Sequence, residues 1–196
     1  MAISLSKNQT ISLEKEAGAG LKKIRMGLGW DQAKPKGLFG KWLNSNSAID
    51  LDASCILLDS LKQSLDLVWF CQLASVDGSI VHSGDNRTGE GDGDDESILV
   101  NLEHLPAKVK HLVFTVNSFT GQSFEAVENA YCRIVDEVNG KELARFNLSE
   151  KGRHTGVVMA YLSRTASGWD LTAVGSVANG KSAQDLTHDA IQAVGK

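Results

Sequence analysis

The twelve residues from Asp85 to Glu96 concentrate more charge than any other stretch of this chain. They hold six carboxylates and one arginine, a net charge of −5, while the whole chain stands at −4. Glycines at positions 89, 91 and 93 alternate with acids, which favours a folded loop over a helix. Like charges at this density repel one another unless a cation lies among them. The stretch therefore predicts a site for a hard divalent ion, with calcium as the first candidate.

Several acids outside the loop extend the candidate ligand set, because calcium takes about six to eight oxygen ligands. Asp31 follows one predicted strand, and Asp50 with Asp52 begins another, where extended backbone turns both side chains to one side. Magnesium fits less well, since it prefers water and substrate phosphates to a cage of carboxylates. The complete candidate set is Asp31, Asp50, Asp52, Asp85, Glu90, Asp92, Asp94, Asp95 and Glu96.

The acidic loop does not follow the EF-hand pattern of alternating acids, a central glycine and a final glutamate. Read from Asp85, the third position is Arg87; read from Glu90, Asp95 replaces the glycine and Asn101 occupies the last place. The remaining ligands must then come from other loops. The alternative is a solvated acidic turn without an ion. Asp50 and Asp52 are equally consistent with ordinary turn chemistry beside a strand.

The sequence offers no catalytic constellation. His82, Ser83 and Asp85 are adjacent, but neighbouring residues of a strand point to opposite faces, so a structural histidine is the better interpretation. The spacing Gly89-x-Gly91-x-Gly93 lacks the lysine of a phosphate loop, and its acids would repel phosphate. Cysteines 55, 71 and 132 lie in apolar strand contexts that predict buried structural thiols. We expect no enzyme.

Composition and strand patterns indicate one soluble all-β domain spanning residues 1–196. Apolar residues make up 42% and charged residues 22%, which is ordinary for a globular protein and excludes a long apolar membrane span. The three cysteines form no metal-binding or disulfide pattern, and the first residues lack a signal segment, so we expect a cytoplasmic protein. The mildly acidic charge gives no case for nucleic-acid binding.

About ten short strands with turns between them favour an antiparallel β-sandwich. The run 67–73 is continuously apolar and predicts a central strand, and Asn139-Gly140 is the strongest hairpin signal. Ser182 with Asp185 resembles a capping box, and an apolar residue recurs every four positions thereafter, so we expect a helix over 182–194. The predicted strands are 23–30, 51–58, 67–73, 79–83, 97–102, 109–116, 131–135, 142–146, 155–162 and 169–174.

The segment 34–43 combines basic residues with Phe39 and Trp42. Such a mixture is typical of a tip that docks on a partner or a membrane surface. Alternatively, the two aromatic side chains fold back over an open end of the sandwich.

Six segments together resemble the signatures of the TerD family, and the resemblance covers about residues 1–177. The insertion after Trp30-Asp31 and the tail after Gly175 are most like the TerZ branch of that family. The segments are Gly27-Leu28-Gly29-Trp30-Asp31, Asp50-Leu51-Asp52-Ala53-Ser54, Val81-His82-Ser83-Gly84-Asp85-Asn86, Thr88-Gly89-Glu90-Gly91-Asp92-Gly93-Asp94-Asp95-Glu96, Asn129-Ala130-Tyr131 and Glu142-Leu143-Ala144-Arg145.

The resemblance implies a calcium-binding sandwich of two five-stranded sheets with loops similar to those of C2 domains. It implies one or two Ca²⁺ ions and a non-enzymatic adaptor role in tellurium resistance and the general stress response. Carried over by position, the ligands come from Asp85, Asp92, Asp94, Asp95 and Glu96, with Asp31, Asp50 and Asp52 as further candidates. Residues 117–122 carry no acid, although many relatives have one there.

The implied partners are other tellurium-resistance proteins, a membrane-anchored one among them, and no nucleic acid. Contact with the inner membrane would then be peripheral and indirect. An alternative function is a calcium-dependent module that binds anionic membrane or another phosphate ligand, with Phe39 and Trp42 inserting into the lipid.

Overall fold

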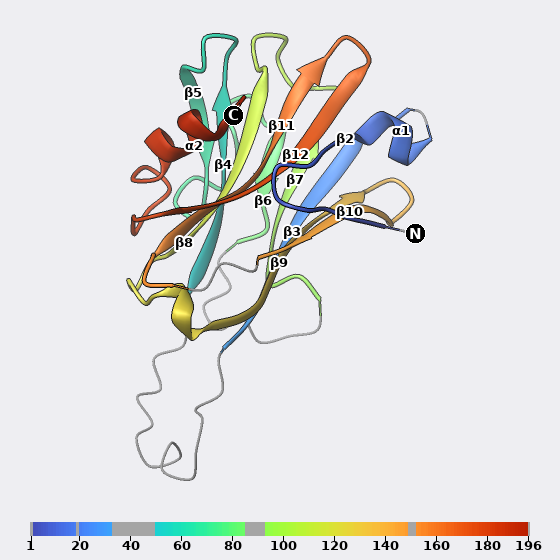
Figure 1. The fold of residues 1–196 in the computed structure, drawn as a ribbon. Coiled ribbons are helices and arrows are strands. Elements are labelled where there is room, and N and C mark those ends of the chain that lie inside the picture. The colour runs from blue at the N-terminus through green and yellow to red at the C-terminus, as the bar shows by residue number, and fades with distance from the viewer. Residues whose placement is uncertain (1, 19, 33–49, 85–92, 149–151, 196) are drawn as a thin grey trace, which may run out of the picture.

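The computed structural model describes residues 2–18, 20–32, 50–84, 93–148 and 152–195. Within these ranges, two six-stranded sheets pack face to face (Figure 1). The sandwich is the predicted fold class. The parallel pair β1–β10 is the exception among otherwise antiparallel neighbours.

Sheet A has the strand order β1-β10-β9-β3-β7-β6. Its strands are β1 (Ile3–Ser4), β3 (Lys23–Gln32), β6 (Ile80–His82), β7 (Glu96–Asn101), β9 (Val127–Asp136) and β10 (Lys141–Asn147). Sheet B has the order β2-β12-β11-β8-β4-β5. Its strands are β2 (Thr10–Ser12), β4 (Leu51–Leu58), β5 (Ser64–Val68), β8 (His111–Ser118), β11 (Gly156–Thr165) and β12 (Gly168–Ala178).

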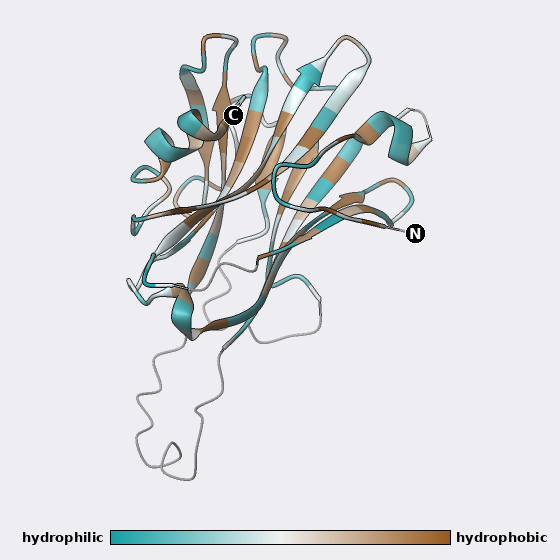
Figure 2. Cartoon of the chain, in the orientation of Figure 1, coloured by the Kyte–Doolittle hydropathy of each residue, from teal (hydrophilic) through white to brown (hydrophobic). Residues whose placement is uncertain are grey.

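Alternation of apolar and polar side chains along the strands builds the core, as Figure 2 shows by colour. Met26, Leu28 and Trp30 of β3 point inward and are at most 3% exposed. Sheet B is apolar on both faces, because its outer face packs against α2 (Thr187–Ala193) through residues such as Ile56 and Ala190. The outer face of sheet A instead carries charged side chains.

One expected strand was wrong, and two other expectations are confirmed with a different strand number or helix start. Residues 67–73 are not a central strand: β5 ends at Val68 on the edge of sheet B, and the apolar residues after it form turns in which Leu73 is 47% exposed. Each sheet has six described strands rather than five, because the short strands β1 and β2 extend the edges. The C-terminal helix begins at Thr187, although Ser182 and Asp185 do exchange the predicted capping hydrogen bonds.

Two short helical elements complete the fold, α1 (Leu13–Ala17) and the 3-10 turn η1 (Phe124–Ala126). The sequence pattern did not indicate α1. The Asn139-Gly140 hairpin is confirmed between β9 and β10, with Gly140 at φ 72°. No helix among the described residues is long and apolar enough to cross a membrane.

The end of β3, the start of β4 and the start of β9 meet at one end of the sandwich (Figure 1). The acidic segment joins β6 to β7, two antiparallel neighbours of sheet A, as predicted. This end of the molecule therefore holds the candidate ligands.

Candidate metal site

Six of the nine candidate ligands lie within the described residues: Asp31, Asp50, Asp52, Asp94, Asp95 and Glu96. Asp85, Glu90 and Asp92 lie outside them, as do Phe39 and Trp42. The expectations for those five side chains remain predictions.

Asp94 lies on the outer face of sheet A between two arginines. Arg25 Nη1 is 2.7 Å from Asp94 Oδ2, and Arg133 donates from Nε to Oδ1 at 2.7 Å and from Nη2 to Oδ2 at 3.1 Å. The Tyr131 hydroxyl donates to Gly93 O at 2.7 Å and lies 3.3 Å from Asp94 Oδ1. We call Arg25, Tyr131 and Arg133 the Asp94 clamp. It fixes the residues that lead from the acidic segment into β7.

Gly27 and Gly29 of β3 provide the space that the Asp94 and Tyr131 side chains occupy. A Cβ atom on Gly27 would collide with the Asp94 carboxylate, and one on Gly29 would collide with the Tyr131 ring. Neither glycine has a positive φ, so the backbone conformation does not require glycine. Glycine is required because a larger residue would fill the space above the strand. The two glycines thus allow the Asp94 and Tyr131 side chains to pack directly against the backbone of β3.

Glu142 and Arg145 of β10 continue the charged network. Glu142 accepts hydrogen bonds from Arg133 Nη1 and Arg145 Nε, each at 3.0 Å, while Arg145 stacks 4.1 Å from the Tyr131 ring centre. Burial acts to raise the pKa of Glu142, but the bonds from Arg145 and Arg133 outweigh it and the pKa is lowered. The hydrogen bond to Asp94 holds the pKa of Arg133 above its usual range. These shifts indicate that Glu142 and Arg133 are both charged at neutral pH.

Asp95 turns toward the irregular end of β3. Its N–H donates to Leu28 O at 2.7 Å, and its Oδ2 accepts from the Trp30 N–H at 2.9 Å. Burial raises the pKa of the Asp95 carboxyl, the Trp30 hydrogen bond opposes that rise, and the nearby Asp31, Asp94 and Glu96 carboxylates add to it. A negative charge on Asp95 is therefore disfavoured by its surroundings.

Asp31 is exposed at the end of β3 and accepts a hydrogen bond from Asn129 Nδ2 at 2.7 Å. Its register partner on β9 is Glu128, a second carboxylate. Like charges directly opposite each other on a sheet are destabilising. Glu128 is not among the acids predicted from the sequence, because the β3–β9 pairing joins residues far apart in the chain.

Glu96 points into the sandwich and reaches across to sheet B. Its Oε2 accepts from the Ala53 N–H at 2.7 Å, and its side chain is fully buried. His82 Nδ1 accepts from the Gly84 N–H, so Nε2 carries the proton that it donates to Ala53 O at 3.0 Å. Because β5 pairs with β4 only from Cys55 onward, Glu96 and His82 complete the backbone hydrogen bonding of β4. His82 is thus structural, as expected.

Asp50 and Asp52 lie on sheet B, where Asp52 Oδ2 accepts from Asn117 Nδ2 at 3.2 Å. Asn117 also donates to Lys181 O at 3.0 Å. Its Oδ1 is buried and has no hydrogen-bond partner. This buried amide oxygen lies beside a carboxylate and is a further oxygen donor outside the predicted ligand set.

The described candidates therefore form two groups at one end of the molecule. Asp31, Asp94, Asp95 and Glu96 belong to sheet A, and Asp50 with Asp52 and Asn117 belongs to sheet B. Within the described ranges, no three His, Cys, Asp or Glu side chains converge closely enough to hold a metal. A site built here needs additional ligands.

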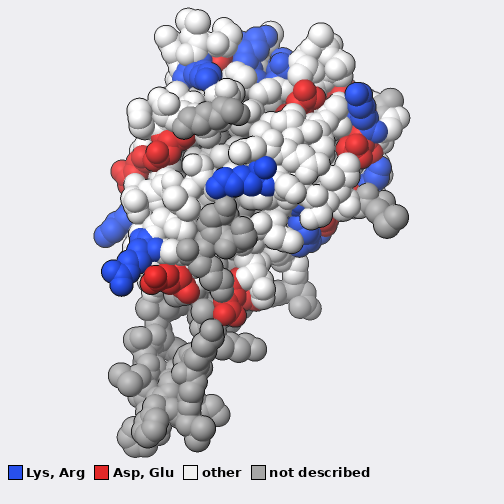
Figure 3. Space-filling model, viewed as in Figure 1, with Lys and Arg blue, Asp and Glu red and all other residues white. Residues whose placement is uncertain are grey.

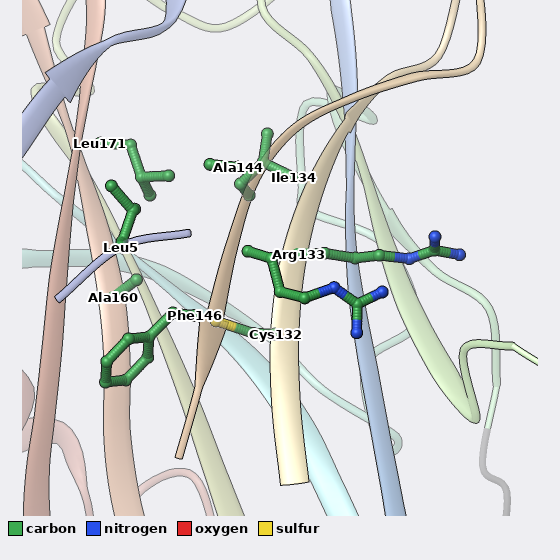
Figure 4. A pocket seen from close by; sticks show the side chains of 9 residues that line it. Leu5, Cys132, Arg133, Ile134, Ala144, Phe146, Ala160 and Leu171 are labelled. Atoms are coloured by element: carbon green, nitrogen blue, oxygen red, sulfur yellow. The ribbon is translucent and has the colours of Figure 1, made fainter. Parts of the chain in front are cut away.

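The cysteines do not have one common environment. Cys55 and Cys132 are buried as expected, whereas Cys71 is exposed, which corrects the prediction. Figure 4 shows Cys132 among apolar side chains, with Arg133 directed away from them. Burial raises the pKa of Cys132 to about 12 and also raises that of Cys55. Neither thiol forms the thiolate that reacts as a nucleophile near neutral pH.

Replacing Gly27 with alanine should lower the free energy of unfolding by about 1–2 kcal/mol, because the added methyl displaces the Asp94 carboxylate. Urea unfolding of the metal-free protein measures the change. In the double variant Gly27→Ala/Asp94→Ala, the glycine substitution should add little to the loss from Asp94→Ala. If the losses of stability from the two single variants simply add in the double variant, the methyl group added at Gly27 does not act through Asp94.

The sequence matches the TerD domain over residues 1–189. The tellurium resistance protein TerZ of Serratia marcescens is 55% identical over 192 residues, covering 98% of each chain. Stress response protein SCP2 of Bacillus subtilis is 39% identical over 196 residues, covering 95% of this chain and 98% of that protein. The tellurium resistance protein TerD of Serratia marcescens is 38% identical over 183 residues, covering 89% and 90%.

A solved structure from Streptomyces coelicolor, described as a homologue of telluride resistance protein (TerD), has the same fold. Its TM-score is 0.67 at 20% identity, and the alignment covers 86% of this chain and 96% of that one. This likeness supports the fold alone.

Proposed function

Because this chain belongs to the TerD family, which includes tellurium resistance and stress response proteins, we propose that it is a calcium-binding, non-enzymatic adaptor in those responses. The observation that carries the proposal is the environment of Asp95. Its carboxylate is half-buried, crowded by Asp31 and Glu96, and held where the acidic segment enters β7. A cation among these carboxylates offsets the repulsion between them.

The chemistry of the described donors supports a hard ion. Asp31 and Asp95 supply carboxylate oxygens, Asn117 supplies an amide oxygen, and His82 is already committed to backbone groups. Oxygen donors of this kind suit Ca²⁺, whereas zinc is held largely by sulfur and nitrogen. The proposal requires further ligands from the acidic segment, where Asp85, Glu90 and Asp92 are the candidates. One or two ions are expected.

The adaptor role rests on the family and on the lack of reactive thiols among buried cysteines. We propose other tellurium-resistance proteins as partners, including a membrane-anchored one, and a cytoplasmic location that is peripheral at the inner membrane. On the face drawn in Figure 3, basic and acidic side chains are interspersed over the described part of the chain. Such a mixture differs from the basic stripe that binds nucleic acid.

Replacing Asp95 with asparagine should change stability in opposite directions with and without calcium. Because the folded environment raises the pKa of Asp95, its charge destabilises the fold above that pKa, and the penalty vanishes below the unfolded value of 3.8. In chelator at pH 7, Asp95→Asn should therefore raise the melting temperature, since asparagine still accepts the Trp30 hydrogen bond. In calcium, the affinity should fall about tenfold or more, because a charged ligand is lost.

The matched control is Asp59→Asn at the far end of β4, where an amide oxygen can still accept the turn hydrogen bonds of Asp59. That variant should leave calcium affinity unchanged. Melting curves in chelator and calcium distinguish the two variants. If Asp95→Asn keeps the full calcium response, Asp95 is not part of the site.

One observation favours a second candidate, calcium-dependent binding to anionic lipid. Phe119 is 50% exposed, donates its N–H to Asp50 O at 3.3 Å, and contacts Phe70, whose ring centre lies 5.3 Å away. Phe70 in turn contacts Trp69. An exposed aromatic group beside candidate ligands is typical of surfaces that enter a membrane interface.

Liposome sedimentation tests this candidate. Vesicles containing phosphatidylserine should retain the protein only with calcium, and Phe119→Ser should reduce that retention several-fold. Leu61→Ser removes another exposed apolar side chain, 75% accessible, and serves as the control. Absence of binding to acidic vesicles in millimolar calcium removes this candidate and leaves the adaptor proposal intact.

A further inference from the structure

We propose that Asp94 anchors the calcium-binding segment and is not itself a calcium ligand. This inference rests on the proposed function. It changes the role of Asp94, the acid at the centre of the charged network, from calcium ligand to anchor. In this assignment, the Asp94 clamp determines how tightly the ion is held without touching it. Asp94, Arg25, Tyr131 and Arg133 are therefore positioning residues.

The hydrogen bonds of Asp94 leave little room for an ion. A carboxylate has about four lone-pair sites, and three guanidinium N–H groups donate to these two oxygens, one to Oδ1 and two to Oδ2. Guanidinium groups are the strongest donors available to a carboxylate. The Tyr131 hydroxyl, whose single proton goes to Gly93 O, lies 3.3 Å from Oδ1 and covers that oxygen. The Asp94 side chain is only 4% exposed, so water does not compete for these positions.

Charge leads to the same conclusion. Two guanidinium groups face Asp94 at 2.7 Å, so the carboxylate is already compensated by cations. A calcium ion bound to the same oxygens would displace one or both arginines and lie close to their positive charges. Asp95 differs, because its carboxylate accepts a hydrogen bond from the Trp30 N–H, which is a backbone group and not a guanidinium group.

The clamp and the backbone of β3 together hold three consecutive residues, Gly93 to Asp95, against β3 and β9. Tyr131 binds Gly93 O, the arginines bind the Asp94 side chain, and Leu28 O with the Trp30 N–H binds Asp95 at its two ends. Residues held in place before the ion arrives do not have to be ordered by it, which lowers the cost of binding. We therefore expect an intact clamp to tighten calcium binding.

Tyr131→Phe is the cleanest test, because it changes no charge and keeps the ring above Gly29. It removes the hydroxyl that donates to Gly93 O. If Asp94 is an anchor, calcium affinity measured by titration calorimetry should fall about five- to tenfold. If Asp94 is a ligand, the hydroxyl 3.3 Å from Asp94 Oδ1 occupies space that the ion needs, and affinity should stay the same or rise.

Arg133→Gln gives a second test in which the two assignments predict opposite signs. The variant frees Asp94 Oδ1 and removes a positive charge, so a ligand role predicts tighter calcium binding. An anchoring role predicts weaker binding, by about tenfold. Lys23→Gln, on the same face of β3 but without a described contact to Asp94, measures the effect of charge removal alone.

A readout without calcium separates the inference from the proposed function. In chelator, hydrogen exchange of the Asp95 amide, which donates to Leu28 O, should be about tenfold faster in Tyr131→Phe than in the parent protein. Unchanged exchange, or calcium binding that tightens in both clamp variants, overturns the anchoring role. A parent protein that binds no calcium, while exchange still accelerates, refutes the proposed function and leaves the clamp as a structural anchor.

Discussion

Replacing Glu96 with alanine should lower the free energy of unfolding by about 3–4 kcal/mol in the absence of calcium. The Glu96 side chain is fully buried, and its Oε2 accepts the Ala53 N–H, which β5 is too short to pair. The substitution leaves that donor without a partner and opens a cavity between the sheets, and each effect costs about 1–3 kcal/mol. Urea unfolding monitored by tryptophan fluorescence measures the loss.

Two further variants identify the cause. Glu96→Gln preserves volume and an acceptor oxygen, so it should cost only about 1 kcal/mol. Glu103→Ala removes an exposed acid whose surface ion pair with Lys22 spans 3.4 Å, and it should change stability by less than about 0.5 kcal/mol. A loss below 1 kcal/mol for Glu96→Ala would show that Glu96 does not join the two sheets.

Adding calcium should raise the free energy of unfolding by about 2.7 kcal/mol when the free ion is at a hundredfold excess over its dissociation constant. The gain arises because the ion binds ligands that folding brings together and has no such site in the unfolded chain. For a domain of this size the melting temperature should rise by about 5–10 °C. Scanning calorimetry in chelator and in millimolar calcium measures the shift.

Magnesium at the same concentration is the matched control for ionic strength and charge. It should stabilise the protein much less, because it dehydrates reluctantly and favours substrate phosphates over carboxylate cages. Equal shifts with the two ions would indicate general screening of the acidic segment. In that case the alternative of a solvated acidic turn is correct.

Much of the fold follows from local sequence patterns. The alternation Met26, Leu28, Trp30 identified β3, and Asn139-Gly140 located the β9–β10 hairpin, because both signals lie within a few residues. The error at residues 67–73 has the opposite origin. An apolar run is typical of a buried strand, yet here its first two residues end the edge strand β5 and the others follow it outside the strand. This outcome depends on strand order and not on composition.

The candidate site, too, could be predicted only in part from the sequence. The acids themselves are visible in the sequence, but the partners that assign their roles are not. Asp94 meets Arg25 and Arg133, which lie 69 and 39 residues away, and Glu96 meets Ala53 across the sandwich, 43 residues away. A pattern of charges therefore predicts a cation site, while only strand register distinguishes an anchor from a ligand.

Titration calorimetry of the metal-free protein with calcium tests the central claim most directly. We predict saturable binding of one or two ions, weakened about tenfold or more by Asp95→Asn and unchanged by Asp59→Asn. Absence of binding up to millimolar calcium, or identical titrations for the parent protein and Asp95→Asn, would contradict the proposed site.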